Sequence, residues 1–237
     1  MISIEILRKE AHMNDEEIME MLKKHPGNAP QYDVSSCMLN ENSPLYGKRI
    51  IFLGSSVTYG AASFAESFVE YLQAEDGVIP YKEAVSSTTL ADVKEGSYVQ
   101  RVQTIPADFK ADAFICQLST NDATKGAPLG KAGDTSVYTA AGAISWIIDY
   151  AKKTWNCPIF FYTGTKFDNP RYEQMIEMLY EIQKTKDFGI IDFWNHPMNE
   201  ISREDYSLYM ADGIHPVKAG YRLWWTPEFR KFLIKNL

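Results

Sequence analysis

The stretch Arg49-Ile-Ile-Phe-Leu-Gly54, followed at once by Ser55-Ser-Val-Thr-Tyr-Gly60, decides how the rest of the chain is interpreted. Its unbroken apolar run ends at a glycine, and this pattern predicts a strand that is buried on both faces of a parallel sheet. The hydroxyl-rich turn comes directly after this strand. Because ligands of open α/β sheets bind beyond the carboxyl ends of the strands, the turn marks the edge where a site is expected.

Strands and helices are predicted to alternate after this first strand. Further apolar or β-branched runs, each predicted to be a strand, span 78–85, 113–118, 158–164 and 189–194. Helical periodicity covers 63–75 and 140–153, and a third helix is expected from Pro170 to about Thr185, with Asn169 as its cap. Alternating elements imply right-handed crossovers, so the fold class is α/β, with a five-stranded parallel sheet covered on both faces.

Composition excludes several classes of protein. The 237 residues, 45% of them hydrophobic, can form one large domain, and 24 basic against 31 acidic residues give a net charge of −7 that disfavours nucleic acid partners. No run approaches the roughly 20 apolar residues of a membrane helix, and the N-terminus lacks a signal-peptide core. Three widely spaced cysteines, Cys37, Cys116 and Cys157, indicate free thiols. We therefore expect a cytoplasmic protein without membrane insertion.

The chain has only four histidines, and three of them lack a convincing acidic partner. His12 is predicted to lie in a polar helix and His25 in an exposed turn before a proline, so both are expected to be solvated. His196 follows the fifth predicted strand and has Asp192 four residues before it. Both would have to leave the strand for the same cleft, so this pair is the less favoured of two candidates.

His215 belongs to the favoured pair, in the sequence Asp212-Gly-Ile-His215-Pro216. Gly213 lets the chain turn sharply, and Pro216 holds His215 extended and begins the last helix. One loop can therefore present the Asp212 carboxylate to one imidazole nitrogen while the other nitrogen faces a cleft. The alternative is an ordinary turn at a helix start.

Hydroxyl and amide groups at other strand ends complete a possible acyl-transfer site. Ser56 is the candidate nucleophile, and its own N–H at a helix start could donate to an oxyanion. Asn121, after the third strand, offers a second donor through its side-chain amide. The polar loop after the second strand offers a backbone N–H. Each of these signals alone has a bland explanation as a cap or a turn, but together they supply the parts of one site.

These residues resemble the SGNH, or GDSL-type, hydrolase family, over about 48–221. The resemblance places the nucleophile on Ser56 and the oxyanion-hole asparagine on Asn121, and the Asp-x-x-His block is intact as Asp212 to His215. Ser87 stands where the family often has an oxyanion glycine, so its N–H becomes the expected donor. The family implies a flavodoxin-like three-layer α/β/α sandwich with no metal and no cofactor.

The resemblance also leads us to expect a serine hydrolase that cleaves a small-molecule acyl ester or thioester. Acetylated sugars, lipids and acyl thioesters are all family substrates. Contacts with the substrate are predicted from the insertion 123–139, including Lys125 and Lys131, and from Tyr59, although the insertion could equally be a mobile loop. In two further replacements, Ser55 stands for the usual aspartate and Ser119 for the usual glycine, and neither removes a catalytic group.

The first 47 residues do not fit the repeat, so we divide the chain into an N-terminal extension, 1–47, and a main domain, 48–237. Asn14, with acidic residues after it, predicts a helix start, and 27–46 is predicted to be polar coil. The extension could pack on the main domain, form a homo-oligomer contact or partly cover the site. Two other functions stay open: a flavodoxin-like flavin-binding module and a catalytically silent binder of acylated carbohydrate.

Overall fold

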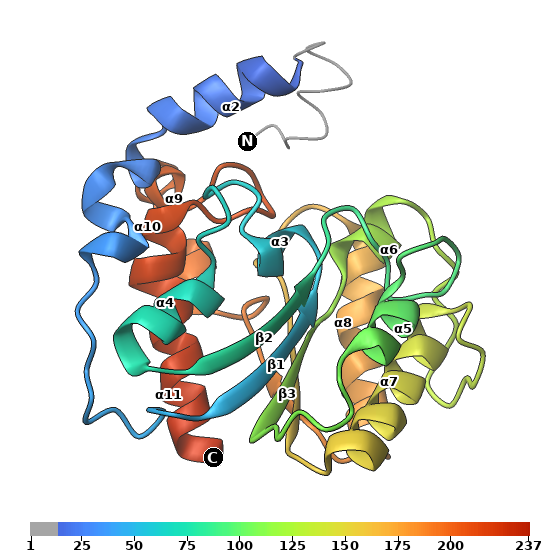
Figure 1. Ribbon diagram of the computed structural model, residues 1–237. Helices are drawn as coiled ribbons and strands as arrows, with labels where there is room; N and C mark the ends of the chain where they lie inside the picture. The colour runs from blue at the N-terminus through green and yellow to red at the C-terminus, as the bar shows by residue number, and fades with distance from the viewer. Residues whose placement is uncertain (1–13) are drawn as a thin grey trace.

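A parallel sheet of five strands forms the centre of the computed structural model, which describes residues 14–237 (Figure 1). The strands, in chain order, are β1 (Arg49–Gly54), β2 (Ile79–Ala84), β3 (Ala113–Gln117), β4 (Ile159–Tyr162) and β5 (Gly189–Ile191). Their spatial order is β2-β1-β3-β4-β5, and every neighbouring pair is parallel. The predicted five-stranded, flavodoxin-like sheet is therefore confirmed.

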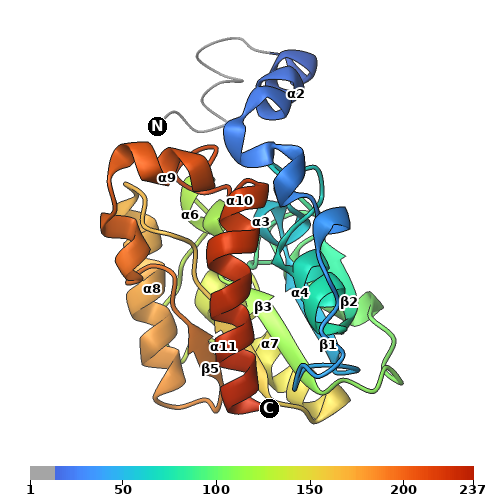
Figure 2. The ribbon, with the colours of Figure 1, turned by 90° about the vertical axis from the view of Figure 1, so that its left-hand side faces the viewer.

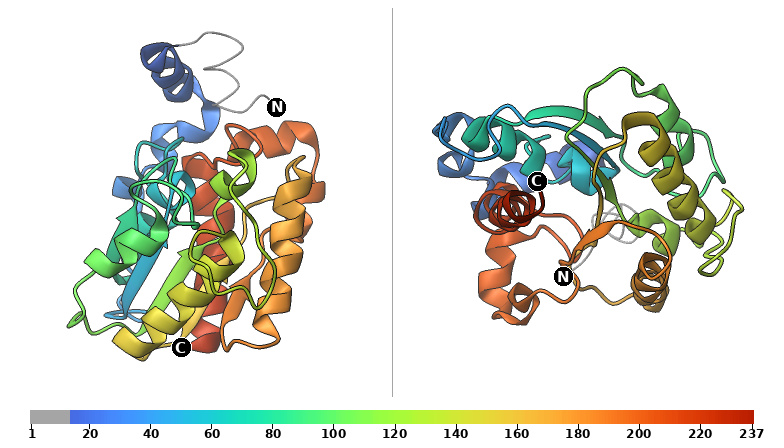
Figure 3. Two further views of the ribbon diagram at one scale, coloured as in Figure 1. Left: turned by 90° about the vertical axis from the view of Figure 1, so that its right-hand side faces the viewer. Right: turned by 90° about the horizontal axis from the view of Figure 1, so that it is seen from below.

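Helices cover both faces of the sheet, which makes three layers (Figures 2 and 3). Ile50 and Phe52 of β1 point toward α4 (Phe68–Asp76) and α11 (Thr226–Asn236). Ile51 and Leu53 point the other way, toward α7 (Ala140–Trp155) and α8 (Pro170–Gln183). All four side chains are fully buried. This two-sided burial is why β1 has a continuous apolar sequence rather than an alternating one.

Short elements collect at the carboxyl edge of the sheet, the upper edge in Figure 1. They include α3 (Ser56–Tyr59) after β1, α6 (Thr120–Thr124) after β3, and α9 (Arg203–Tyr209) and α10 (Lys218–Gly220) on either side of the loop 210–217. A helical turn, α5 (Tyr98–Arg101), follows the β2 loop, and a π-helical turn, Tyr221–Trp225, leads into α11. The C-terminus lies at the opposite edge (Figure 1).

The predicted helix 63–75 is wrong at its start, because α4 begins only at Phe68. Ser67 caps it: the Ser67 side chain accepts from the backbone N–H of Val69, and the Glu70 carboxylate accepts from the Ser67 N–H at 2.8 Å. Phe64 and Ala65 have φ values of 56° and 66°, so the chain turns through left-handed conformations before the helix. The local cap therefore overrides an apolar periodicity that extended back to Phe64.

The other predicted boundaries agree with the structure to within a few residues. The largest difference among the strands is at the end of β5, which stops at Ile191 rather than at 194. Asn169 caps α8 by accepting from the N–H groups of Arg171 and Tyr172. Asn14 caps α2 (Asp15–Lys24) in a capping box with Glu17. The predicted polar coil 27–46 contains 3₁₀ turns at Pro26–Asn28, Pro30–Tyr32 and Val34–Ser36. His12 lies outside the described residues. Over 14–237, no helix has the length and apolar character needed to cross a membrane.

Candidate active site

Ser56 begins α3, in a turn that is held by hydrogen bonds to the buried Gln117 side chain. The Gln117 side-chain oxygen accepts from the N–H of Ser55 at 2.8 Å and from the hydroxyl of Thr58 at 3.0 Å. Gly54 makes this compact turn possible, because a Cβ there would lie 1.7 Å from Thr58 Oγ1. Ser55 and Thr58 are fully buried, whereas Ser56 is 8% exposed. The first strand therefore delivers the Ser56 hydroxyl to the surface of the sheet edge in a fixed direction.

His215 and Asp212 form a compact loop near the other end of the chain. Asp212 is fully buried, and its Oδ1 accepts from the N–H groups of Ile214 and His215, both at 2.7 Å. Its Oδ2 lies 2.9 Å from His215 Nδ1. A β-bridge between Met210 and Pro216 closes the loop. The carboxylate thus orients both the backbone and the imidazole ring of the histidine.

Gly213 contributes to this loop differently from the expectation, because its φ is not positive. A Cβ at Gly213 would lie 3.2 Å from the Phe167 side chain, so close approach of the segment after β4 favours glycine here. The hydroxyl of Thr165, in the same segment, donates to the Gly213 carbonyl at 3.2 Å. The loop is therefore anchored to the end of a central strand.

The turn that bears Ser56 and the loop that bears His215 meet at the sheet edge, although the two residues lie 159 positions apart in sequence. Ser56 Oγ lies 2.9 Å from His215 Nε2. Because the Asp212 carboxylate can only accept, His215 Nδ1 holds the proton and Nε2 presents a lone pair to the hydroxyl. The three side chains thus form a hydrogen-bonded relay, and its geometry suits removal of a proton from Ser56.

The two other predicted oxyanion donors, Ser87 and Asn121, lie on neighbouring segments of the same edge. Ser87 has a φ of 67°, which lies in the left-handed region where glycine is favoured. Asn121 is 8% exposed, and its amide nitrogen donates to the Thr88 carbonyl at 2.9 Å and to Ser55 Oγ at 3.2 Å. Asn121 therefore joins the turn that bears Ser56 to the loop that holds Ser87.

Arg101, which sequence reasoning missed, holds this loop against the sheet. Its buried guanidinium donates to the Gly54 carbonyl at 2.8 Å and to Thr88 Oγ1 at 2.9 Å. It also donates to the carbonyls of Glu83 and Gly96 at 3.0 and 2.9 Å. One planar side chain thus connects the ends of two strands with the Ser87 loop. Arg101 is the last residue of α5, and nothing in the sequence indicated these contacts.

Asp122 fixes the far end of the same loop. Its fully buried carboxylate accepts from the N–H of Leu90 at 2.7 Å and from that of Ala91 at 2.9 Å. Burial raises the pKa of the Asp122 carboxyl to about 6, and these hydrogen bonds oppose the shift. The two residues after β3 therefore have different contacts. Asn121 bonds to Ser55 beside Ser56, and Asp122 holds the backbone of Leu90 and Ala91 at the end of the Ser87 loop.

The three predicted substrate-binding residues lie in different surroundings. Tyr59 is 44% exposed at the end of α3, with Lys82 Nζ 5.6 Å from its ring. Lys125 Nζ donates to the Ser87 carbonyl at 2.8 Å, which places it beside the predicted oxyanion loop. Lys131 lines a hollow against α8 together with Gln174 and other residues of that helix. The structure therefore brings Lys125 next to the site, whereas the position of Lys131 gives its predicted role no support.

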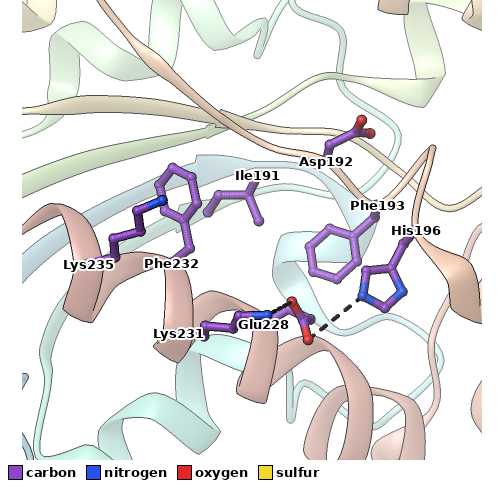
Figure 4. Close-up of a pocket in the computed structure, with 8 residues that line it drawn as sticks. All are labelled: Ile191, Asp192, Phe193, His196, Glu228, Lys231, Phe232 and Lys235. Carbon is purple, nitrogen blue, oxygen red and sulfur yellow. Dashed lines mark ion pairs between the residues drawn. The ribbon is translucent and has the colours of Figure 1, made fainter.

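Asp192 and His196, the alternative acid and base pair, bind other partners rather than each other. Trp224 Nε1 and the Met198 N–H both donate to His196 Nδ1, each at 3.2 Å. His196 Nε2 instead faces Glu228 at 3.7 Å, across a separate cavity between β5 and α11 (Figure 4). The Asp192 carboxylate accepts from Tyr180 at 2.7 Å. This histidine therefore belongs to a structural contact and not to the site at Ser56.

His25 is half-buried rather than solvated as expected, and its ring accepts from the Gly27 N–H at 3.1 Å. Burial lowers the pKa of this imidazole. Cys37, Cys116 and Cys157 are free thiols, as predicted. Among residues 14–237, no group of three or more His, Cys, Asp or Glu side chains is arranged to hold a metal ion.

Residues 52–223 match the model of the GDSL-like Lipase/Acylhydrolase family, so the chain belongs to this family and is a hydrolase of the esterase and lipase type. The matched range includes Ser56, Asn121, Asp212 and His215. A search of curated proteins found no match.

Solved structures share the fold at low sequence identity. A protein of Lactobacillus plantarum is 22% identical, with a TM-score of 0.67, over 81% of this chain and 99% of that one. A protein of Bacteroides ovatus, described as GDSL-like, is 18% identical with a TM-score of 0.60, over 80% and 99% of the two chains. The inhibitor-bound aryl esterase of M. smegmatis is 14% identical with a TM-score of 0.51, over 81% and 100%. At these identities the likeness establishes the fold alone.

The raised pKa of the buried Asp122 carboxyl should make the stability difference between wild type and Asp122→Asn depend on pH. Its pKa of about 6 in the folded protein exceeds the ordinary value of 3.8, so its contribution to stability is complete only below that ordinary value and is lost as the pH rises through 6. Asp122→Asn removes this titration. We expect the gap in unfolding free energy between wild type and variant to be larger at pH 4 than at pH 7 by roughly 2 kcal/mol.

Chemical denaturation at both pH values measures this gap. Asp187→Asn is the control, because that carboxylate is 94% exposed, and its gap should stay constant. A gap for Asp122→Asn that is independent of pH, or that widens toward pH 7, would contradict the assignment.

Proposed function

We propose that the protein is a serine esterase that cleaves a small-molecule ester or thioester through an acyl-enzyme intermediate. The relay from Ser56 Oγ through the His215 ring to the buried Asp212 carboxylate, with contacts of 2.9 Å at each step, carries this proposal. A hydroxyl is a weak nucleophile at neutral pH and needs an adjacent base. Among the described residues, His215 is the imidazole in contact with Ser56.

The reaction proceeds in two halves. His215 Nε2 takes the Ser56 proton as Oγ attacks the acyl carbon, and the imidazolium is stabilised by Asp212. The imidazolium then gives its proton to the departing alcohol or thiol, which leaves the acyl group bonded to Ser56. A water molecule, deprotonated by His215, attacks this acyl group and releases the acid. The proton returns to Ser56 Oγ, so the enzyme is regenerated.

Three donors are assigned to the oxyanion: the N–H groups of Ser56 and Ser87 and the side-chain amide of Asn121. Both hydrogens of that amide already have partners, so the oxyanion must replace one of them. The 3.2 Å contact with Ser55 Oγ is the longer and is the one expected to yield. The exchange would happen only as negative charge develops, which favours the transition state over the substrate.

The substrate class is proposed as an ester of a short acyl group with a carbohydrate or lipid alcohol, or a thioester. Tyr59 offers an exposed aromatic surface three residues after Ser56, and Lys125 offers a cation beside Ser87. We keep these two residues as substrate contacts, while Lys131 stays a prediction from the sequence. Cytoplasmic residence is proposed on the strength of three free thiols.

The flavin-binding alternative is disfavoured by the contacts of the nucleophile turn. A phosphate-binding loop presents free backbone N–H groups to its ligand. Here the N–H of Ser55 and, at 3.4 Å, that of Thr58 are directed at Gln117 Oε1 in the interior. A silent binder of acylated carbohydrate would have no need of a base in contact with Ser56.

Removal of the Ser56 hydroxyl tests the proposed function. Ser56→Ala should lower kcat for 4-nitrophenyl acetate by at least about 10³-fold, because the variant lacks the hydroxyl that would accept the acyl group. Ser86→Ala, at an exposed position of the same edge, is the control and should retain wild-type turnover. Equal turnover by Ser56→Ala and wild type would refute the assignment.

Replacement of Ser87 by glycine tests the oxyanion loop. Ser87→Gly should raise the free energy of unfolding by up to about 1 kcal/mol, since glycine tolerates a φ of 67°. Its kcat should stay within about threefold of wild type, because the donor belongs to the backbone. Ser86→Gly, at a position without positive φ, should instead destabilise the protein, as thermal denaturation would show. A destabilised Ser87→Gly variant would contradict this account.

A further inference from the structure

Residues 25–36, which we call the N-terminal strap, run along α10 before β1 begins (Figure 2). The family match starts only at residue 52, so the strap lies outside the matched range. We propose that the strap is part of the catalytic apparatus: Asn28 is a positioning residue that holds the nucleophile turn and the histidine loop at the separation where Ser56 and His215 meet. This inference rests on the proposed function.

The buried side chain of Asn28 connects three segments of the chain. Its amide nitrogen donates to the carbonyls of Leu22 and Ala62, at 3.0 and 2.9 Å. Its oxygen accepts from the N–H of Lys218 at 3.0 Å. Both amide hydrogens and the amide oxygen are thus in use, and Asn28 is only 7% exposed. Few side chains other than asparagine can donate twice and accept in so small a space.

Two of these partners lead directly to the reacting groups. Ala62 follows Ala61, whose N–H donates to the Ser56 carbonyl at 3.0 Å. Lys218 lies three residues after His215 and begins α10. Asn28 therefore bridges the segment after the nucleophile and the segment after the base, across 34 and 190 residues of sequence. A shift of either segment would change the contact between Ser56 and His215.

Charged groups form a second link at the same place. Lys218 Nζ lies 2.5 Å from an Asp33 carboxylate oxygen and 3.2 Å from one of Glu66. The other Glu66 oxygen accepts from the Val34 N–H at 2.9 Å. Asp33 and Val34 belong to the strap, Glu66 to the loop after Ser56, and Lys218 to the helix after His215. The strap, the loop after Ser56 and the helix after His215 are thus joined twice.

The loop that the strap holds needs such support. Phe64 and Ala65 are consecutive residues in left-handed conformations, each of which costs roughly 1–2 kcal/mol unless its surroundings fix it. The fit of the strap is also close, because a Cβ at Gly27 would lie 2.0 Å from the Leu208 carbonyl oxygen and 2.5 Å from the Val217 side chain. A strap that merely covered the surface would not require this contact.

Asn28→Asp tests the inference, because it keeps the shape and the acceptor for Lys218 but loses both donated hydrogen bonds. A misplacement of about 1 Å can cost around 10²-fold in rate. We expect kcat for 4-nitrophenyl acetate to fall at least about tenfold while KM changes less than about twofold. The rate of fluorophosphonate labelling at Ser56 should fall by the same factor.

The control is Asn156→Ala, which loses an asparagine with a φ of 48° that ends α7, just before β4 at the opposite edge of the sheet. It should lower the melting temperature and leave kcat unchanged. If both variants are destabilised and both keep wild-type kcat, the strap is only structural and the inference is overturned. Should Asn28→Asp fail to fold, Asp33→Asn replaces it, with a fall in kcat of about threefold expected and an unchanged kcat contradicting the inference.

Failure of the proposed function is recognised separately, by turnover in Ser56→Ala equal to wild type. The ¹⁵N chemical shift of His215 Nε2 then still tests the positioning, because it responds to the Ser56 hydroxyl without turnover. Asn28→Asp should shift this resonance toward its value in Ser56→Ala. A resonance that stays at the wild-type position would overturn the inference.

Discussion

The hydrogen bond between Ser56 Oγ and His215 Nε2 joins the end of the first strand to a loop near the C-terminus, and the surrounding structure fixes its 2.9 Å length. In a parallel sheet every strand ends at the same edge, so residues far apart in sequence can meet there. β1 delivers the serine, while the histidine loop returns to the edge between α9 and α10. The contact exists only if both segments are held from several directions.

Buried polar contacts supply that support. Gln117 fixes the turn that bears Ser56, and Asp212 fixes the loop that bears His215. Arg101 and Asp122 hold the loop that contains Ser87 through hydrogen bonds to Thr88 and Ala91. Hydrogen bonds to charged groups contribute about 1.5–3 kcal/mol each, and loss of one partner leaves the other buried and unsatisfied. Paired polar neighbours therefore hold the residues of the proposed site in place.

The sequence predicted those parts of the structure that depend on local patterns. Five apolar runs gave the strands, and the Asp-x-x-His loop and the serine turn gave the groups that meet. The start of α4 was predicted wrongly because a cap at Ser67 outweighed the apolar periodicity before it. Arg101, Gln117 and Asn28 had no signal that marked their roles, since each acts through partners distant in sequence. The polar sequence of 27–46 predicted only coil, and the N-terminal strap, residues 25–36, is recognised only from its contacts.

A crystal structure of the protein after reaction with a phosphonate ester tests the central claim most directly, since such an ester imitates the tetrahedral intermediate of acyl transfer. The account predicts a bond from phosphorus to Ser56 Oγ, with the phosphonyl oxygen within hydrogen-bond distance of the N–H groups of Ser56 and Ser87 and of the Asn121 amide. A bond to Ser55, or a phosphonyl oxygen directed away from all three donors, would contradict it.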